Sequence, residues 1–283
     1  MVGDRRVLVI SLVGTSLLQN FVRFEKYRSI VEKYRSKGID YWYRLSLDDE
    51  RNRVPDGYIC QIVRGHELYN ALLEYALENL REASAELNGL LGIADLYSYR
   101  YSDIDVLLYN TKSCTSRLCT SIIRDVLEKL GFHSIQSIEI KGIRSIDEFE
   151  YGLIEILDKV VKIIANKKRE NYRVFINATP GFKAETTFFV LASILVNADS
   201  IIYIHESFRT PVILPIPPIT IDRDKIDRIL KIFKDSNEID LGILYSIGLN
   251  EKDIVELRDR GIIEIANGKA ILRKWIRKLL ELL

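Results

Sequence analysis

The chain from residue 172 to 189 reads YRVFINATPGFKAETTFF and combines features that suit anion binding. Its first part predicts a strand, and an Asn-Ala-Thr-Pro-Gly turn at 177–181 leads straight into a predicted helix. Thr179 suits the N-cap of that helix and Pro180 its first position. Lys183 then falls in the first helical turn, where a cation opposes the positive end of the helix dipole. Because free backbone N–H groups and this dipole attract anions, we predict a phosphate site completed by Lys183.

A second candidate loop, Gly14-Thr15-Ser16, follows the apolar run at 6–13. A near-continuous apolar run is typical of a strand buried on both faces of a parallel sheet. In such sheets ligands bind outside the carboxyl ends of the strands. We therefore expect this loop and the turn before Lys183 to face one cleft.

Strands and helices alternate over most of the chain. The patterns predict strands at 6–13, 103–109, 134–140, 173–177, 200–205 and, as an antiparallel edge strand, 212–216. They predict helices at 21–36, 67–91, 121–130, 149–166 and from 182 to about 197. This alternation indicates the α/β class, with a Rossmann-like open, mostly parallel sheet over residues 1–220.

The prolines between 215 and 218 predict a domain boundary. Beyond it, helices are expected at 225–234, 240–247, 251–260 and 273–283, with a hairpin through Asn267-Gly268. This order indicates a small winged helix-turn-helix-like domain over residues 221–283. The third helix carries four acidic residues against three basic ones, so we do not expect it to bind DNA.

Composition gives further limits. The net charge is +1, so no global field draws the chain to nucleic acid or membrane. The absence of a long apolar run or signal peptide predicts a cytoplasmic protein without a membrane segment. Cys60, Cys114 and Cys119 lack CxxC spacing and are expected to be reduced thiols. The sequence shows no cluster of carboxylates or histidines of the kind that binds a metal, so neither a metal site nor a cofactor is expected.

The two loops together resemble the CARF (CRISPR-associated Rossmann fold) domain over roughly residues 5–220. The pattern is most similar to the standalone ring nucleases of type III CRISPR systems, which carry a C-terminal winged-helix module. The resemblance implies a homodimer that binds cyclic tetra-adenylate and cleaves it without a metal. It assigns the activity to Ser16 and Lys183. Pro180 departs from the common Thr-Gly-Gly form and removes one backbone donor.

Such a ring is RNA, so a ribose 2′-hydroxyl can attack the neighbouring phosphorus and leave a 2′,3′-cyclic phosphate on linear di-adenylate. The protein must then align the reacting oxygens and stabilise charge on the phosphoryl group. Further ligand contacts are expected from residues in the same loops and at a middle strand end: Gly14, Thr15, Leu17, Asn20, Thr111, Lys112, Asn177, Thr179, Gly181 and Phe182. Asn177 is also expected to buttress its turn.

Several alternatives stay open. Ser16 alternatively caps the first helix, and Lys183 is alternatively a surface lysine. A second functional hypothesis is a transcription regulator that senses a cyclic oligoadenylate without cleaving it. A third is a sensor domain for an effector nuclease, although no histidine follows His205 to complete an Arg-x4–6-His motif. Cyclic tetra- and hexa-adenylate both fit this loop chemistry, and the resemblance favours the smaller ring.

Overall fold

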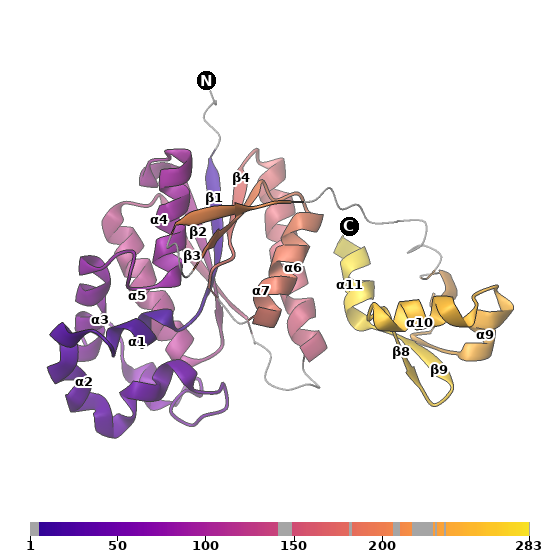
Figure 1. The fold of residues 1–283 in the computed structure, drawn as a ribbon, viewed down its shortest axis with the longest axis horizontal. Coiled ribbons are helices and arrows are strands. Elements are labelled where there is room, and N and C mark those ends of the chain that lie inside the picture. Colours follow the sequence, from indigo (N-terminus) through magenta and orange to yellow (C-terminus); the bar gives the residue numbers. More distant parts are fainter. Residues whose placement is uncertain are drawn as a thin grey trace.

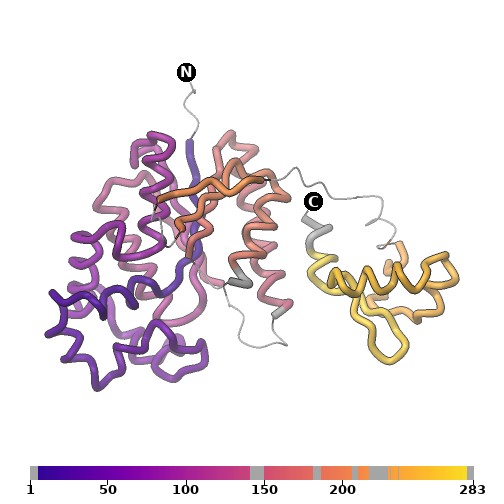
Figure 2. Tube along the Cα trace, in the orientation of Figure 1, coloured from indigo at the N-terminus to yellow at the C-terminus, as the bar shows by residue number. Residues whose placement is uncertain are grey.

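A computed structural model describes residues 6–140, 149–180, 183–205, 210–216, 229, 231–234 and 236–282 (Figures 1 and 2). The larger unit contains six strands: β1 (Val7–Val13), β2 (Ile104–Thr111), β3 (Ser134–Ile140), β4 (Arg173–Asn177), β5 (Ser200–Ile204) and β6 (Pro211–Leu214). Its α-helices are α1 (Ser16–Phe21), α2 (Arg28–Tyr34), α3 (Glu67–Glu78), α4 (Ala85–Tyr97), α5 (Cys114–Leu130), α6 (Phe149–Arg169) and α7 (Lys183–Leu195). Short 3-10 helices cover Glu25–Tyr27, Arg35–Lys37, Ile39–Arg44, Tyr58–Gln61 and Tyr101–Asp103.

The six strands form one sheet in the order β3-β2-β1-β4-β5-β6. The first five are mutually parallel, and β6 runs antiparallel to β5. This confirms the predicted α/β class and the mostly parallel sheet. The edge strand is antiparallel as predicted, although it occupies Pro211–Leu214 rather than 212–216.

Alternate residues of β1 point into two separate hydrophobic cores. Val7 and Val9 belong to the core shared with α3, α4 and α5, whereas Leu8 and Ile10 belong to the core shared with α6 and α7. All seven residues of β1 are buried. The sheet is therefore covered by helices on both faces, which explains the near-continuous apolar run of β1, interrupted only by Ser11.

Three predicted helix boundaries were wrong, two of them because a side-chain cap starts a helix where apolar periodicity gives no signal. The region 21–36 divides into the end of α1, a 3-10 helix, α2 and the start of a second 3-10 helix, and no side chain caps α2. The predicted helix 67–91 is two helices, since the Ser84 hydroxyl oxygen accepts from the Leu87 N–H and starts α4. The predicted helix 121–130 begins seven residues earlier, where Ser113 caps α5 through the Ser116 N–H.

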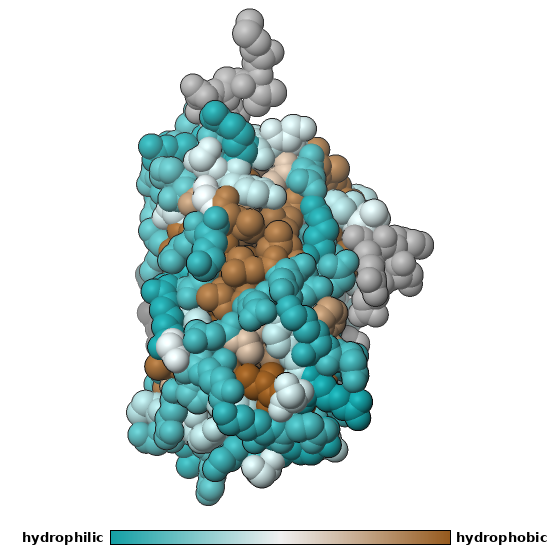
Figure 3. Space-filling model, turned by 90° about the vertical axis from the view of Figure 1, so that its left-hand side faces the viewer, coloured by the Kyte–Doolittle hydropathy of each residue, from teal (hydrophilic) through white to brown (hydrophobic). Residues whose placement is uncertain are grey.

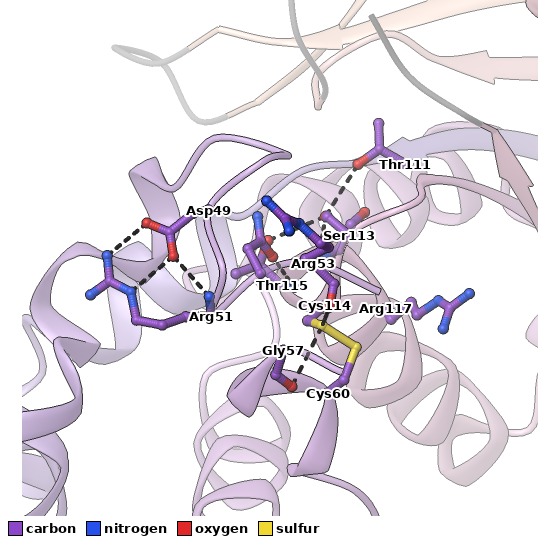
Figure 4. Close-up of a disulfide and its surroundings, with 12 residues drawn as sticks. Asp49, Arg51, Arg53, Gly57, Cys60, Thr111, Ser113, Cys114, Thr115 and Arg117 are labelled. Atoms are coloured by element: carbon purple, nitrogen blue, oxygen red, sulfur yellow. Dashed lines mark hydrogen bonds and ion pairs between the residues drawn. A yellow bond between two sulfur atoms is a disulfide. The ribbon is translucent and has the colours of Figure 1, made fainter. Parts of the chain in front are cut away.

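The expectation of three reduced thiols was also wrong. Cys60 and Cys114 form a disulfide across 54 residues, while Cys119 is free and buried (Figure 4). The bond joins the 3-10 helix at Tyr58–Gln61 to the first residue of α5. Asn52 ties the same segments together, because its backbone and side-chain oxygens accept from the N–H groups of Cys114 and Thr115. Residue spacing gave no sign of this tertiary contact.

The C-terminal unit contains β7 (Glu238–Asp240), α9 (Leu241–Ser246), α10 (Glu251–Asp259), β8 (Ile263–Ala266), β9 (Lys269–Leu272) and α11 (Lys274–Leu282). Its sheet has the order β7-β9-β8. The predicted hairpin is present, with positive φ at Asn267 and Gly268. β7 was not predicted. Half of the helix expected at 225–234, and the later part of the boundary expected at 215–218, lie outside the described residues.

The C-terminal unit contacts the larger unit through α11 and α6. Arg273 Nε lies 3.4 Å from a Glu150 oxygen, and Lys278 Nζ lies 3.1 Å from Asp158 Oδ1. The ring of Trp275 packs edge-on against Phe188 of α7.

On the opposite side of the sheet, the face formed by the helices at the left of Figure 1 shows an apolar area framed by hydrophilic residues (Figure 3). Across the described ranges, no helix combines the length and apolar character needed to cross a bilayer.

Candidate site at the carboxyl edge of the sheet

The sheet order places the two predicted loops side by side. β1 pairs directly with β4, and Ser11 lies opposite Asn177 near their carboxyl ends. From β1 the chain builds β2 and β3 on one side, then crosses to build β4 and β5 on the other. The gap between β1 and β4 is therefore the topological switch point, where open α/β sheets bind ligands.

A buried carboxyl group organises the loop after β1. The Gly14 N–H donates to Glu86 Oε1 at 2.6 Å, and Ser16 Oγ lies 3.0 Å from Glu86 Oε2. The Ala85 N–H donates to Ser16 Oγ at 3.1 Å. Ser16 therefore links the loop to α4. The interpretation of Ser16 as a helix cap was wrong, because Thr15 is the N-cap residue of α1 and no side chain caps it.

Glu86 was not predicted to belong to the site. It lies in the first turn of α4, where an acidic residue ordinarily complements the helix dipole and faces solvent. Here its side chain is fully buried, and burial raises its pKa above the ordinary range. The hydrogen bonds from Gly14 and Ser16 oppose this shift by stabilising the ionised form. Seventy residues separate Glu86 from Ser16, and no local pattern joins them.

The other residues predicted near Ser16 mostly serve the loop itself. The Thr15 hydroxyl donates to the Tyr43 carbonyl at 2.9 Å. Leu17 is fully buried in the core, so only its backbone could meet a ligand. The Asn20 amide donates to the Glu82 carbonyl at 2.9 Å. These contacts fix the loop between α1, the 3-10 helix at Ile39–Arg44 and the start of α4.

Asn177 buttresses the turn after β4, as predicted. Its Nδ2 donates to Ser11 Oγ at 3.1 Å and to the Glu86 carbonyl at 3.3 Å, while its Oδ1 accepts from the Thr179 N–H at 3.3 Å. The side chain is fully buried. Asn177 therefore joins β1, β4 and α4 below the loops rather than presenting its amide to solvent.

The predicted start of the helix after β4 was wrong. α7 begins at Lys183, so Thr179 is not its N-cap and Pro180 is not its first residue. The Thr179 hydroxyl oxygen instead accepts from the Ile204 N–H at 2.8 Å, which ties the turn to the end of β5. Thr186 of α7 donates to the Pro180 carbonyl at 3.1 Å. Gly181, Phe182 and the side chain of Lys183 lie outside the described residues.

The loop after β2 extends the same edge of the sheet. β2 is the other neighbour of β1, and its last residue, Thr111, is buried. Thr111 Oγ1 lies 3.4 Å from Ser113 Oγ. Lys112 is exposed, and its N–H donates to the Ile140 carbonyl at 2.8 Å. Lys112 thus lies on the carboxyl edge, one strand away from the loop that holds Ser16.

Two pockets lie along α5 rather than between the predicted loops. One, of about 660 Å³, borders the disulfide and Arg64, and the other, of about 250 Å³, lies between α5 and β3. Arg117 and Arg124 line both. Arg117 is paired with Glu139 at 2.5 and 2.9 Å, Arg64 is paired with Asp125, and Arg124 Nε lies 3.4 Å from Glu128 Oε1. Each arginine that lines these two pockets is therefore ion-paired, unlike the cation expected at a phosphate site. Within the described ranges, no three His, Cys, Asp or Glu side chains gather as metal ligands.

The fold and loops define an α/β protein with a candidate ligand site at the switch point of its sheet. Residues 81–217 match the family model of the CRISPR-associated protein Cas_APE2256. The matched segment runs from just before α4 to just after β6, and it supports a CRISPR-associated family for this chain. A solved structure, protein VC1899 from Vibrio cholerae, is similar at 10% identity with a TM-score of 0.29. That alignment covers 62% of this chain and 59% of that one.

Proposed function

We propose that this protein is a ring nuclease that binds cyclic tetra-adenylate as a homodimer and cleaves it to linear di-adenylate, switching off type III CRISPR signalling. The single observation that carries the proposal is the pairing of β1 with β4. It brings the loop of Ser16 beside the turn that leads into Lys183, although 167 positions separate these residues. The CRISPR-associated family match supports the biological setting.

The proposed reaction needs no nucleophile from the protein. A ribose 2′-hydroxyl gives its proton to solvent and its oxygen forms a bond to the neighbouring phosphorus, while the bond from phosphorus to the 5′-oxygen breaks. The 5′-oxygen takes the released electron pair and a proton from solvent, which leaves a 2′,3′-cyclic phosphate and a 5′-hydroxyl. Lys183 is proposed to stabilise charge on a non-bridging oxygen, and Ser16 to position the ribose or phosphate.

The test is incubation of the purified protein with radiolabelled cyclic tetra-adenylate in EDTA, followed by chromatography of the products. We expect linear products with 2′,3′-cyclic phosphate ends, lost in Lys183→Ala and strongly reduced in Ser16→Ala. Lys33→Ala is the matched control, because Lys33 is an exposed lysine of α2 that pairs with Glu67. Tight binding without products would instead favour the regulator hypothesis.

The C-terminal unit is proposed to be a winged helix-turn-helix module that supports dimerisation or covers the cleft. Its order of β7, two helices and the β8–β9 hairpin supports this interpretation. Through Trp275 and Lys278, α11 contacts Glu150 and Asp158, which lie in the half of α6 nearer the carboxyl edge of the sheet. Salt-sensitive, nanomolar binding to promoter DNA would contradict this role.

A further inference from the structure

We propose that Glu86 sets the hydrogen-bonding direction of Ser16, so that the ionised carboxylate makes Ser16 an acceptor for a ribose 2′-hydroxyl. This inference rests on the proposed function and assigns Glu86 as a positioning residue within it. It follows from counting the protons and lone pairs at three groups whose contacts are known: Gly14, Ser16 and Glu86.

The count begins with the two contacts that have only one direction. A serine hydroxyl has one proton and two lone pairs, whereas a backbone N–H can only donate. One lone pair of Ser16 is therefore used by the Ala85 N–H at 3.1 Å. Likewise, Glu86 Oε1 must accept from the Gly14 N–H at 2.6 Å. Only the contact between Ser16 Oγ and Glu86 Oε2, at 3.0 Å, can run in either direction.

When Glu86 is ionised, its Oε2 can only accept, so the Ser16 proton points to the carboxylate. The remaining lone pair of Ser16 is then its only unused group, and it requires a ligand that donates. A ribose 2′-hydroxyl can donate, whereas the non-bridging oxygens of a phosphodiester cannot. In this state Ser16 orients the 2′-oxygen rather than the phosphate.

When Glu86 is neutral, its Oε2 can carry the proton and donate to Ser16. Both lone pairs of Ser16 then accept hydrogen bonds, and its O–H is available to donate to the ligand. Ser16 becomes a donor suited to a phosphoryl oxygen. The protonation state of one buried carboxyl therefore selects which part of the ring Ser16 holds.

The surroundings of Glu86 allow it to titrate. Burial raises its pKa, and hydrogen bonds from the Gly14 N–H, from its own backbone N–H, from Ser16 and from Ser84 partly offset this. The free thiol of Cys119 faces it from α5, and its own pKa is raised by burial and by the charge of Glu86. From β4 and the cap of α4, the neighbouring side chains are Asn177 and Ser84, which do not titrate.

The first experiment compares binding of cyclic tetra-adenylate with its 2′-deoxy analogue over a series of rising pH values, on ice before turnover. Once the pH is high enough to ionise Glu86, we expect the wild type to bind the ribose ring about tenfold more tightly, the equivalent of one hydrogen bond. Glu86→Gln should lose this preference, because the glutamine carbonyl keeps the Gly14 contact while its amide donates to Ser16. Glu82→Gln, an exposed neighbour, is the control. An unchanged preference in Glu86→Gln would overturn the inference.

The second experiment measures cleavage as a function of pH. The wild-type kcat should rise as Glu86 ionises, whereas Glu86→Gln should be at least tenfold slower with a flat acid limb and little change in KM. Wild-type pH dependence in Glu86→Gln would count against the assignment. If neither protein cleaves the ring but the ribose preference is lost in Glu86→Gln, the nuclease proposal fails and the role of Glu86 stands.

A third readout needs no ligand. A carboxyl whose pKa is raised in the folded state stabilises the protein fully below its unfolded value, and this contribution disappears as pH rises through the folded value. The unfolding free energy of Glu86→Gln minus that of the wild type should therefore increase as pH rises from the unfolded pKa of a glutamate through the raised folded pKa of Glu86. A gap that stays constant with pH would show that Glu86 does not titrate in this range. If neither ring binds, the proposed function fails, and this measurement decides the titration of Glu86.

Discussion

Gly89→Ala should destabilise this protein, against the usual effect of that change in a helix. Replacing an interior helical glycine by alanine ordinarily stabilises by about 1 kcal/mol. At Gly89 of α4, however, an added Cβ would overlap Oδ1, Cγ and Nδ2 of Asn177, each closer than the 3.0 Å that real Cβ atoms keep. Asn177 is fully buried and hydrogen-bonded to Ser11, Glu86 and Thr179.

The magnitude follows from these contacts. Overpacking of this kind costs about 1–3 kcal/mol, and each hydrogen bond of Asn177 that breaks costs about 1 kcal/mol. With two of these hydrogen bonds broken and about 1 kcal/mol regained from helix propensity, the net loss is roughly 2–4 kcal/mol. Urea unfolding followed by circular dichroism measures it. Gly92→Ala is the matched control, because its Cβ would meet Pro211 at 3.3 Å, a contact that small shifts can relieve.

A double-mutant cycle isolates the overlap itself. Asn177→Ala removes the colliding amide, so Gly89→Ala made in that background should be neutral or stabilising. The coupling between the two positions should then be about 2–5 kcal/mol. Equal effects of Gly89→Ala with and without Asn177 would refute the reasoning, as would a single Gly89→Ala variant more stable than the wild type.

Three further changes test the packing around the site by urea unfolding. Tyr109→Phe should be neutral or stabilise by about 1 kcal/mol, because this buried hydroxyl has no hydrogen-bond partner among the described residues; a clear loss of stability would contradict this. Thr179→Val should cost about 1–3 kcal/mol by leaving the Ile204 N–H without its acceptor, whereas Thr179→Ser should cost less. Reducing the Cys60–Cys114 bond should lower stability by about 4 kcal/mol for its span of 54 residues, and the double alanine variant should not respond to reductant.

The sheet could be predicted from the sequence because burial leaves a direct pattern. The residues of β3 and β4 match their predicted bounds, Ser134–Ile140 and Arg173–Asn177. The pairing of β1 with β4 was not predicted. Only the expectation that their loops face one cleft was, and it came from the general rule for ligand sites in parallel sheets. The helix starts that were predicted wrongly depended on buried polar side chains, which apolar periodicity does not mark. The first two turns of α5 carry buried Thr115, Ser116 and Thr120, so apolar periodicity did not reveal them.

Of the candidate site, the sequence predicted the two loops but not the residues that support them from elsewhere in the fold. Ser16 and the turn containing Asn177 stand in short local motifs that a sequence displays directly. Glu86 depends on where α4 packs, and the pairing of Cys60 with Cys114 depends on how the segment before α3 folds back onto α5. Neither relation is encoded in residue spacing. Both required the tertiary structure.

The long segment between β1 and β2, residues 14–103, therefore shapes the candidate site as well as the fold. α4, and not the short α1, delivers a carboxyl to the loop after β1 and a backbone carbonyl to Asn177 below the turn after β4. The two loops thus share one support, and Gly89 lets that support approach the sheet. A shift of α4 along the sheet would move both loops together. Substitutions far from Ser16 that weaken the packing of the segment 14–103 should consequently displace Ser16 through its contact with Glu86 rather than through the strands.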